Sequence, residues 1–178
     1  ATNGQALLRS SSTSSLAVTI KAATAGARIG DVIIEGISFD GENKAFDGGL
    51  ARPALVMGVD LDRLVIIDCQ FWRSDRSGID LLRSAGRLES NDFWDCRVSI
   101  SSNDGVGLVV ERNYLRESKD NGIYITRSSQ NFDATIVRDN KVYTVNAQGR
   151  TETWYNTIPR YVMFSLAFKL HKKAKNAE

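Results

Sequence analysis

The chain has 178 residues, a formal net charge of +2 and 42% hydrophobic residues. This length suits one domain, and the apolar content together with 25% charged residues excludes a disordered chain. Residues 169–178 carry four lysines and one glutamate, so the remaining body has a charge of −1 and gives no support for nucleic-acid binding. No apolar run approaches the roughly 18 residues of a membrane-spanning helix.

The first part of the chain contains strand patterns followed by one insertion. Leu16, Val18 and Ile20 alternate with smaller residues, as in a strand with one buried face. Residues 31–41 show the same alternation with several Ile and Val residues and give the first clear coil. Residues 42–52, with two adjacent glycines, are then expected to form an inserted loop.

The segment from Leu64 to Val145 repeats one pattern four times. Its reference column holds one cysteine and three asparagines, spaced 22, 22 and 27 residues apart: Cys69, Asn91, Asn113 and Asn140. One apolar column lies three residues earlier (Ile66, Leu88, Val110, Val137) and another lies two residues later (Phe71, Phe93, Leu115, Val142). We expect Gly36 to occupy the reference column of the first coil. A fixed period in this range is typical of a solenoid.

The alternation within each repeat predicts strands rather than helices. Three short strands separated by three bends account for roughly 22 residues per turn, so we predict an all-β, right-handed, single-stranded parallel β-helix of about six to eight coils. Equivalent residues then stack along the axis. Stacked asparagine side chains can bond to one another, and asparagine also tolerates a left-handed bend at this corner.

The repeat ends near Gly149 and divides the chain into residues 1–149, the solenoid, and residues 150–178. In the second part Tyr161–Leu170 alternates almost strictly between apolar and other residues. We expect this segment to be a strand that caps the open end of the solenoid, followed by a basic tail. The chain starts at Ala1 with no visible signal peptide, so we expect a piece of a longer product.

The two cysteines test the alignment. Cys69 lies in the reference column, whereas Cys96 lies five residues after that column in the next coil. Five extended residues separate them by on the order of 15 Å, which is beyond the reach of a disulfide. We therefore predict two free thiols that serve as small packing residues.

A second strand column precedes each bend and suggests a binding surface. Residues 78–84 match residues 122–128, and if their isoleucines point inward, the residues between them point outward on one sheet face. In this alignment the outward column is Val56, Asp80, Ser99 and Tyr124. The candidate ligand-binding residues are Asp80, Arg83, Ser99, Tyr124 and Arg127. Tyrosine stacking and Arg or Asp hydrogen bonds suit a saccharide or another small polar ligand, although a solvated face would give the same pattern.

Other chemistry has little support. His171 is the only histidine, so Ser-His-Asp and Cys-His catalysis have no basis. No His/Cys cluster suggests a metal, and no motif identifies a cofactor, so the catalytic residues and the cofactor are unknown. Trp72 and Trp94 share a column, and we expect them to pack under a loop rather than to stack on a ligand.

Several segments resemble a known family. They are residues 32–41, Ile67-Asp68-Cys69, Gly78-Ile79, residues 87–91 and Asn121-Gly122-Ile123. Through them the chain resembles the pectate-lyase-like parallel β-helix proteins, and among these the twin-arginine-translocated uncharacterised repeat proteins. The resemblance implies export of the folded protein to the periplasm or beyond. It also carries a suggested cofactor-binding role without catalytic residues.

Three functional hypotheses follow. The first is an exported, non-catalytic β-helix that binds a polar ligand, such as a saccharide or cofactor, on the Asp80/Tyr124 face. The second is a carbohydrate-active enzyme, a lyase, epimerase or hydrolase of acidic polysaccharide. Acid/base hydrolysis would need two carboxylates, and the outward column supplies only one. The third is a fragment of a structural spike or adhesin. This hypothesis would be favoured if the chain forms trimers.

Overall fold

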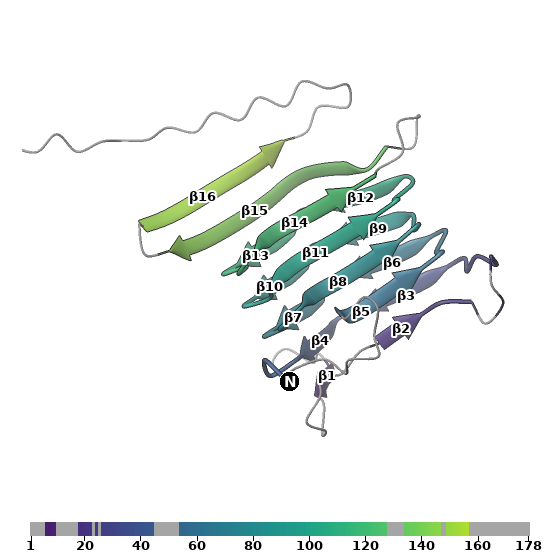
Figure 1. Cartoon of the computed structure of the whole chain (residues 1–178), viewed down its shortest axis with the longest axis horizontal. Coiled ribbons are helices and arrows are strands. Elements are labelled where there is room, and N and C mark those ends of the chain that lie inside the picture. Colours follow the sequence, from purple (N-terminus) through teal and green to yellow (C-terminus); the bar gives the residue numbers. More distant parts are fainter. Residues whose placement is uncertain are drawn as a thin grey trace, which may run out of the picture.

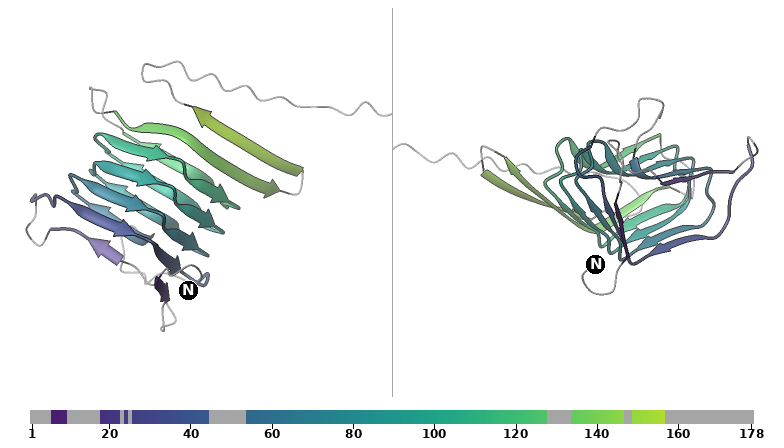
Figure 2. Two further views of the ribbon diagram at one scale, coloured as in Figure 1. Left: turned by 180° about the vertical axis from the view of Figure 1, so that it is seen from behind. Right: turned by 90° about the horizontal axis from the view of Figure 1, so that it is seen from below.

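A computed structural model shows the chain wound into a parallel β-solenoid (Figure 1). The structure describes residues 6–9, 18–22, 24, 26–44, 54–127, 134–146 and 149–156. Every helix or strand assigned in these ranges is a β-strand, so the all-β prediction is confirmed. Seen along the stack, the coils superpose around one axis, and the last two strands extend beyond them (Figure 2).

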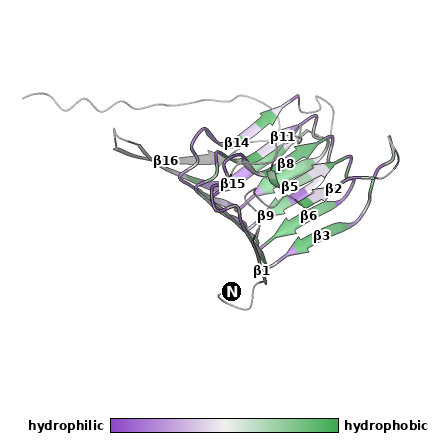
Figure 3. Ribbon diagram, turned by 60° about the horizontal axis from the view of Figure 1, so that its bottom comes forward, coloured by the Kyte–Doolittle hydropathy of each residue, from purple (hydrophilic) through white to green (hydrophobic). Residues whose placement is uncertain are grey.

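One strand from each successive coil joins a five-stranded parallel sheet. In spatial order its members are β2 (Val18–Ile20), β5 (Ala54–Val59), β8 (Ser77–Leu82), β11 (Val98–Asn103) and β14 (Asn121–Thr126). Hydrophobic residues run along these strands, whereas the turns between strands are mostly hydrophilic (Figure 3). The sheet therefore forms one wall of an apolar interior.

An eleven-stranded sheet forms the other walls of the solenoid. One row of parallel strands consists of β3 (Val32–Glu35), β6 (Leu64–Ile67), β9 (Gly86–Glu89) and β12 (Leu108–Glu111). The second row consists of β1 (Ala6–Arg9), β4 (Ile37–Asp40), β7 (Gln70–Trp72), β10 (Asp92–Trp94) and β13 (Tyr114–Arg116). The rows meet in β15 (Ile136–Asn146), which pairs with both β12 and β13.

The described residues form fewer coils than predicted. The five strands of the first sheet correspond to about four turns of the chain, not six to eight. Two stretches lengthen the coils, because the equivalent residues Ile37 and Cys69 are 32 positions apart, and Asn113 and Asn140 are 27 apart. In addition, the chain leaves the parallel repeat after β15. The inserted loop expected at residues 42–52 lies largely outside the described residues.

The predicted apolar columns are confirmed. Strand pairing places Ile66, Leu88, Val110 and Val137 in register, and it does the same for Phe71, Phe93, Leu115 and Val142. Phe39 extends the second column, so three phenylalanine rings stack with centroid separations of 5.0 and 4.8 Å. Each coil therefore buries its apolar residues against the coils above and below it.

The asparagine column forms a continuous hydrogen-bonded ladder. Asn91 Nδ2 donates to Asn113 Oδ1 over 3.0 Å, and Asn113 Nδ2 donates to Asn140 Oδ1 over 2.9 Å. Each of these oxygens also accepts a backbone N–H from the preceding coil, at 3.0 Å. At the first rung the backbone N–H of Cys69 donates to Asn91 Oδ1. The ladder thus satisfies buried polar groups at a corner of the solenoid.

This corner departs from the sequence prediction in two respects. The left-handed residue precedes the asparagine: Ser90 and Arg112 both have φ of 54°. Asparagine is therefore selected for its amide and not for a bend. Gly36, with φ of 65°, aligns with Asp68 and not with the reference column, where the equivalent residue is Ile37.

The C-terminal strands end the repeat. β16 (Gly149–Asn156) runs antiparallel to β15, and the register shifts between Arg138 and Asn140. An antiparallel strand cannot continue a parallel coil, so β16 covers the outer edge of β15. The domain division predicted at residue 149 falls at the start of this strand. The capping strand predicted at Tyr161–Leu170 lies outside the described residues.

Both cysteines are free and buried, as predicted. Cys69 Sγ lies 3.6 Å from the carbonyl oxygen of Ile34, the position where an asparagine would donate. Burial raises the pKa of the Cys96 thiol to about 12. Neither sulfur is placed for thiolate chemistry at neutral pH.

Replacing Asn113 with alanine should lower the free energy of unfolding by about 3 kcal/mol, because it removes the side-chain donor to Leu88 O and the acceptor of the Asn91 backbone N–H and of one Asn91 Nδ2 hydrogen bond. Urea denaturation measures this loss. Asn121→Ala, in an exposed position, is the matched control and should change stability by less than about 0.5 kcal/mol. Equal effects of the two changes would contradict a stabilising ladder.

Replacing Cys69 with asparagine should extend the ladder by one rung. The new amide would donate to Ile34 O, as Asn91 Nδ2 does to Ile66 O over 2.9 Å. We expect an increase of about 1 kcal/mol in the free energy of unfolding, measured by the same urea titration. A loss of stability would show that the corner around Cys69 is shaped for a smaller side chain.

Candidate functional site

The face predicted from the sequence is the outer side of the five-stranded sheet. Strand pairing aligns Met57, Asp80, Ser101 and Tyr124 in the outward column. Asp80 and Tyr124 thus share one column, in the positions predicted for them. Those of Val56 and Ser99 are wrong, because Val56 pairs with the inward Ile79 and Ser101 takes the position expected for Ser99.

The strand pairing accounts for the displacement of Ser99. The turn before β8 spans residues 73–76, and the one before β14 spans residues 117–120, whereas the turn before β11 has only residues 95–97. Despite the shorter turn, Ile100 pairs with Ile79 and Ile123, so β11 stays in phase with its neighbours and Ser101, not Ser99, lies beside Asp80. Ser99 is 0% exposed, and its hydroxyl lies 2.8 Å from that of Ser118. It cannot contact a ligand on the outer face in this arrangement.

The remaining members of this column differ in exposure. Asp80 is 6% exposed and Ser101 is 9% exposed, so the centre of the face is closed to solvent. Tyr124, in contrast, is 49% exposed at the end of the stack. A ligand on this face could therefore reach the tyrosine ring but not the buried carboxylate.

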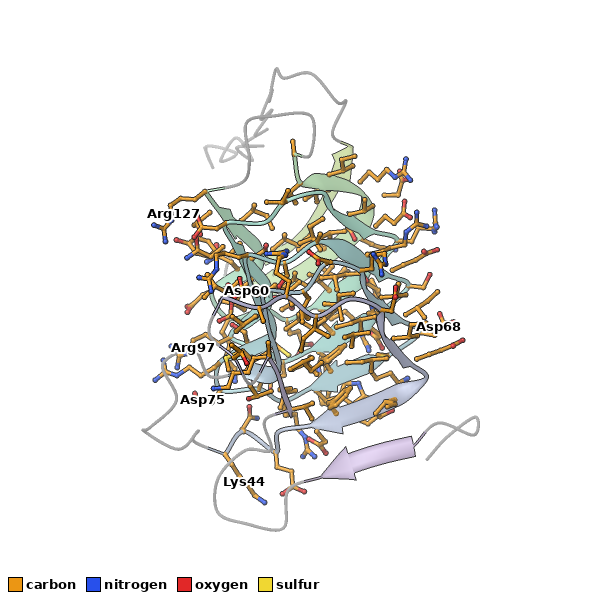
Figure 4. All side chains as sticks on the ribbon, turned by 90° about the vertical axis from the view of Figure 1, so that its right-hand side faces the viewer. Lys44, Asp60, Asp68, Asp75, Arg97 and Arg127 are labelled. Carbon is orange, nitrogen blue, oxygen red and sulfur yellow. The ribbon has the colours of Figure 1, made fainter. Side chains whose placement is uncertain are left out.

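The two predicted arginines belong to a column of alternating charge at the strand ends. Asp60, Arg83, Asp104 and Arg127 occupy equivalent left-handed turn positions, with φ between 48° and 55°. Arg83 donates to both oxygens of Asp60 over 2.7 Å. Arg127 Nε lies 3.3 Å from Asp104 Oδ1 and donates to Asn103 Oδ1 over 3.1 Å. Both guanidinium groups are therefore already engaged within the protein. Asp60 and Arg127 lie on the same side of the stack (Figure 4).

The same alternation occurs at another turn. Arg97 lies between Asp75 and Asp120 of the neighbouring coils, with N–O distances of 3.2 and 3.8 Å. Asp75 and Arg97 lie on the same side of the stack (Figure 4). Like charges stacked at roughly 4.8 Å would repel, so alternation stabilises neighbouring coils in register. These charges are explained by the fold.

A buried carboxylate marks the outer side of the β6, β9 and β12 row. The Glu111 side chain is 0% exposed and lies within 3.3 Å of three arginine side chains, those of Arg87, Arg112 and Arg138. Removing a charge from water requires such compensation. This cluster is a structural network that joins three coils.

The row of β7, β10 and β13 presents a different outer surface, here called the aromatic face. It is defined by two columns of outward residues: Gln70, Asp92 and Tyr114, and Trp72, Trp94 and Arg116. Trp94 is 37% exposed, so it is not packed under a loop as predicted. Its indole N–H donates to Glu117 Oε2 over 2.8 Å, which fixes the orientation of the ring.

Polar and charged groups lie beside these rings. Arg116 contacts both oxygens of Asp92, at 3.2 and 2.7 Å. Burial raises the pKa of Asp92, and the charge of Arg116 opposes this shift. Arg116 and Lys141 both lie over the ring of Tyr114, at 5.2 and 5.6 Å from its centroid. The aromatic face therefore combines a partly exposed indole with an ordered ion pair.

Sequence reasoning found the tryptophan column but not its polar neighbours. Trp72 and Trp94 are 22 residues apart, and this spacing indicated that they share a column. The missing signal was the direction of the side chains: Phe71 and Phe93 are 0% exposed, so the tryptophans that follow them must point outward. The same alternation places Asp92 and Arg116 on the outer side.

Within the described ranges, no group of three or more His, Cys, Asp and Glu side chains is arranged to hold a metal ion. The same part of the chain contains no helix with the length and apolarity needed to span a membrane.

The stacked strands, inward columns and corner ladder define a parallel β-solenoid. Residues 3–142 match the family model described as the right-handed β-helix region, and the protein belongs to this family. No curated protein and no solved structure matches the chain. The β-helix part of the predicted resemblance is therefore confirmed, and the twin-arginine-translocated branch stays a prediction.

Acid should weaken the charge pairs between coils. Hydrogen bonds from Arg83 hold the pKa of Asp60 below its ordinary value, and those from Arg112 and Arg87 do the same for Glu89. A carboxylate with a depressed folded-state pKa stabilises the protein above its unfolded-state pKa, and this contribution is lost as the pH falls through the folded-state pKa. The melting temperature should therefore decrease when the pH is lowered below about 4.

The double change Asp60→Asn/Glu89→Gln should make this fall shallower, since neither amide can titrate. Thermal unfolding between pH 7 and pH 2, followed by circular dichroism, compares the two proteins. Identical slopes would show that other carboxylates govern the acid response.

Proposed function

We propose that this protein is a non-catalytic binding module that holds a saccharide on the aromatic face. The observation that carries the proposal is the oriented indole of Trp94, which is 37% exposed and anchored by Glu117. A flat apolar ring of fixed orientation is suited to stacking against the apolar face of a sugar ring. Because its orientation is set before binding, little side-chain entropy would be lost.

The neighbours of Trp94 supply the polar half of such a site. Asp92 and Arg116 lie in the adjoining column positions, and their ion pair leaves oxygen lone pairs and N–H groups that can bond to hydroxyls. Gln70 aligns with Asp92 one coil earlier. Hydroxyl-rich rings are recognised by this combination of stacking and hydrogen bonding.

The Asp80/Tyr124 face is retained as the second location. Tyr124 is exposed there, but Asp80 is buried and the two arginines are held by acidic neighbours or by Asn103. Stacking on a single tyrosine would remain as the main contact. The two faces can be separated by single substitutions, because they lie on different walls of the solenoid.

A carbohydrate-active enzyme is the rival function. Burial raises the pKa of Asp92, as a general acid requires, and this is the observation that favours it. The ion pair with Arg116 opposes that role, because it favours the charged carboxylate. We therefore prefer binding to catalysis.

We also propose that the protein functions after export to the periplasm or the cell exterior. Support comes from the resemblance of residues 32–41 and 87–91 to the twin-arginine-translocated repeat proteins. Export in the folded state would suit a solenoid whose coils stabilise only their neighbours.

Binding and turnover should be measured on a panel of neutral and acidic polysaccharides with four proteins: wild type, Trp94→Ala, Tyr124→Ala and Asp92→Asn. We expect wild-type binding without turnover, weakened about tenfold by Trp94→Ala and unchanged by Tyr124→Ala. Both changes remove an aromatic ring from an exposed strand position, so each is the control for the other.

The opposite pattern, with loss only in Tyr124→Ala, would move the site to the first face. Turnover that Asp92→Asn abolishes would make the protein an enzyme. A stable trimer in solution that binds no polysaccharide would instead support a structural spike or adhesin.

A further inference from the structure

The strands β3, β6, β9 and β12 lie side by side, and the first residues of β15 continue this row (Figure 1). Their outward residues form two columns, here called the aliphatic face. The first column is Ile33, Val65, Arg87, Val109 and Ile136, and the second is Glu35, Ile67, Glu89, Glu111 and Arg138. Apolar residues therefore occupy the outer as well as the inner side of this wall.

The apolar members of the aliphatic face are open to solvent. Ile33 is 68% exposed, more than any other large apolar residue in the described ranges. Val65, Ile67, Val109 and Ile136 are each partly exposed. A connected row of exposed aliphatic residues is typical of a surface that is covered in an assembly.

The charged residues at the centre of the face leave room for aliphatic contact. Arg87 Nη1 lies 3.2 Å from a carboxylate oxygen of Glu89 and 3.1 Å from one of Glu111. Its guanidinium is therefore directed toward the second column, and its methylene groups can stay in the first. Arg112 also contacts Glu89, so the carboxylates at the centre are already compensated.

The two ends of the second column carry opposite charges. Glu35, on β3, is exposed and makes no ion pair within the described part of the chain. Arg138, on β15, donates to Glu111, yet its side chain is 47% exposed. An acidic group at one end and a basic group at the other make this face complementary to a reversed copy of itself.

A two-fold axis along β9 would bring each end of the face against the opposite end of a second copy. Glu35 would then meet Arg138 of the second copy, and Ile33 would meet Ile136. Each contact would occur twice, because the axis repeats it. The ends of the face would thus contribute two ion pairs and two aliphatic contacts.

The inner positions of the face agree with this arrangement. Val65 would pack on Val109 of the second copy. At the axis, Arg87 and Glu89 from both copies would form a group with no net charge, so charge of one sign would not be concentrated there.

We propose that two copies of this chain associate through the aliphatic face as a two-fold dimer with reversed coil order. None of the residues of this face is aromatic, so it does not suit stacking on a sugar. Its carboxylates disfavour an anionic lipid surface. The aromatic face lies on a different wall, and the dimer would leave Trp94 accessible.

Sedimentation velocity of the full chain over a range of concentrations tests the association. We expect wild type to approach twice the chain mass of 19.6 kDa as the concentration rises. Ile33→Lys and Glu35→Lys should each raise the dissociation constant at least about tenfold, because they place a positive charge against Ile136 or Arg138 of the other copy. Tyr124→Lys replaces an exposed apolar residue on the other sheet and, as the matched control, should leave the constant within about twofold of wild type. Circular dichroism shows whether each variant is folded.

A pair of introduced cysteines tests the reversed order of the coils. In one chain Ile33 and Ile136 lie four coils apart, about 19 Å at roughly 4.8 Å per coil, so Ile33→Cys/Ile136→Cys cannot form a disulfide within the chain. On mild oxidation we expect this double variant to form a covalent dimer, whereas either single variant should run as a monomer under denaturing conditions. Cys69 and Cys96 are buried and do not compete for the disulfide.

A wild-type chain that stays monomeric at every concentration would overturn the proposal. A dimer that both Ile33→Lys and Glu35→Lys leave intact would also overturn it, since the contact would then lie elsewhere on the molecule. Cross-linking by Ile33→Cys alone, or a dimeric double variant that does not cross-link, would exclude the reversed orientation.

Discussion

The whole stack depends on hydrogen bonding at the asparagine corner. Backbone N–H groups at a bend point away from the strand ladders, and a buried one without a partner is costly. Asn113 and Asn140 each place an oxygen where it accepts both a backbone N–H and a side-chain amide of the preceding coil. This arrangement works in only one register. The ladder therefore aligns the aliphatic and phenylalanine columns on either side of it.

The sequence predicted the parts of the fold that repeat with constant spacing. The columns that begin with Ile66 and Phe71 flank the asparagine corner at fixed distances, so their inward direction could be derived. The long strands follow turns of different length, so spacing could not show that Ile100 pairs with Ile79 rather than with Leu81. As a result, two of the candidate residues, Asp80 and Tyr124, were assigned to the right column and Ser99 was not.

The two surfaces considered for ligand binding differ in how their charges are used. At the strand ends, Asp60 and Arg83 alternate along the axis and complete each other's hydrogen bonds. Such a column stabilises the contact between coils, and its hydrogen-bonding groups are largely used within the protein rather than open to a ligand. On the aromatic face, Glu117 instead orients Trp94, an uncharged ring that stays partly exposed. The contrast explains why a row of charged residues in a solenoid sequence is weak evidence for a binding site.

The short turn at residues 95–97 has a consequence for how such proteins change during evolution. Deleting or inserting one residue in a turn alters which side chains of the following strand meet solvent, while the asparagine corner holds the coils in place. The same change would turn the apolar side chains of that strand away from the core, unless the strand pairs back in phase, as β11 does through Ile100 and Ile79. Where the core column is kept in this way, repeats of this kind would diversify in what they recognise faster than in how they fold.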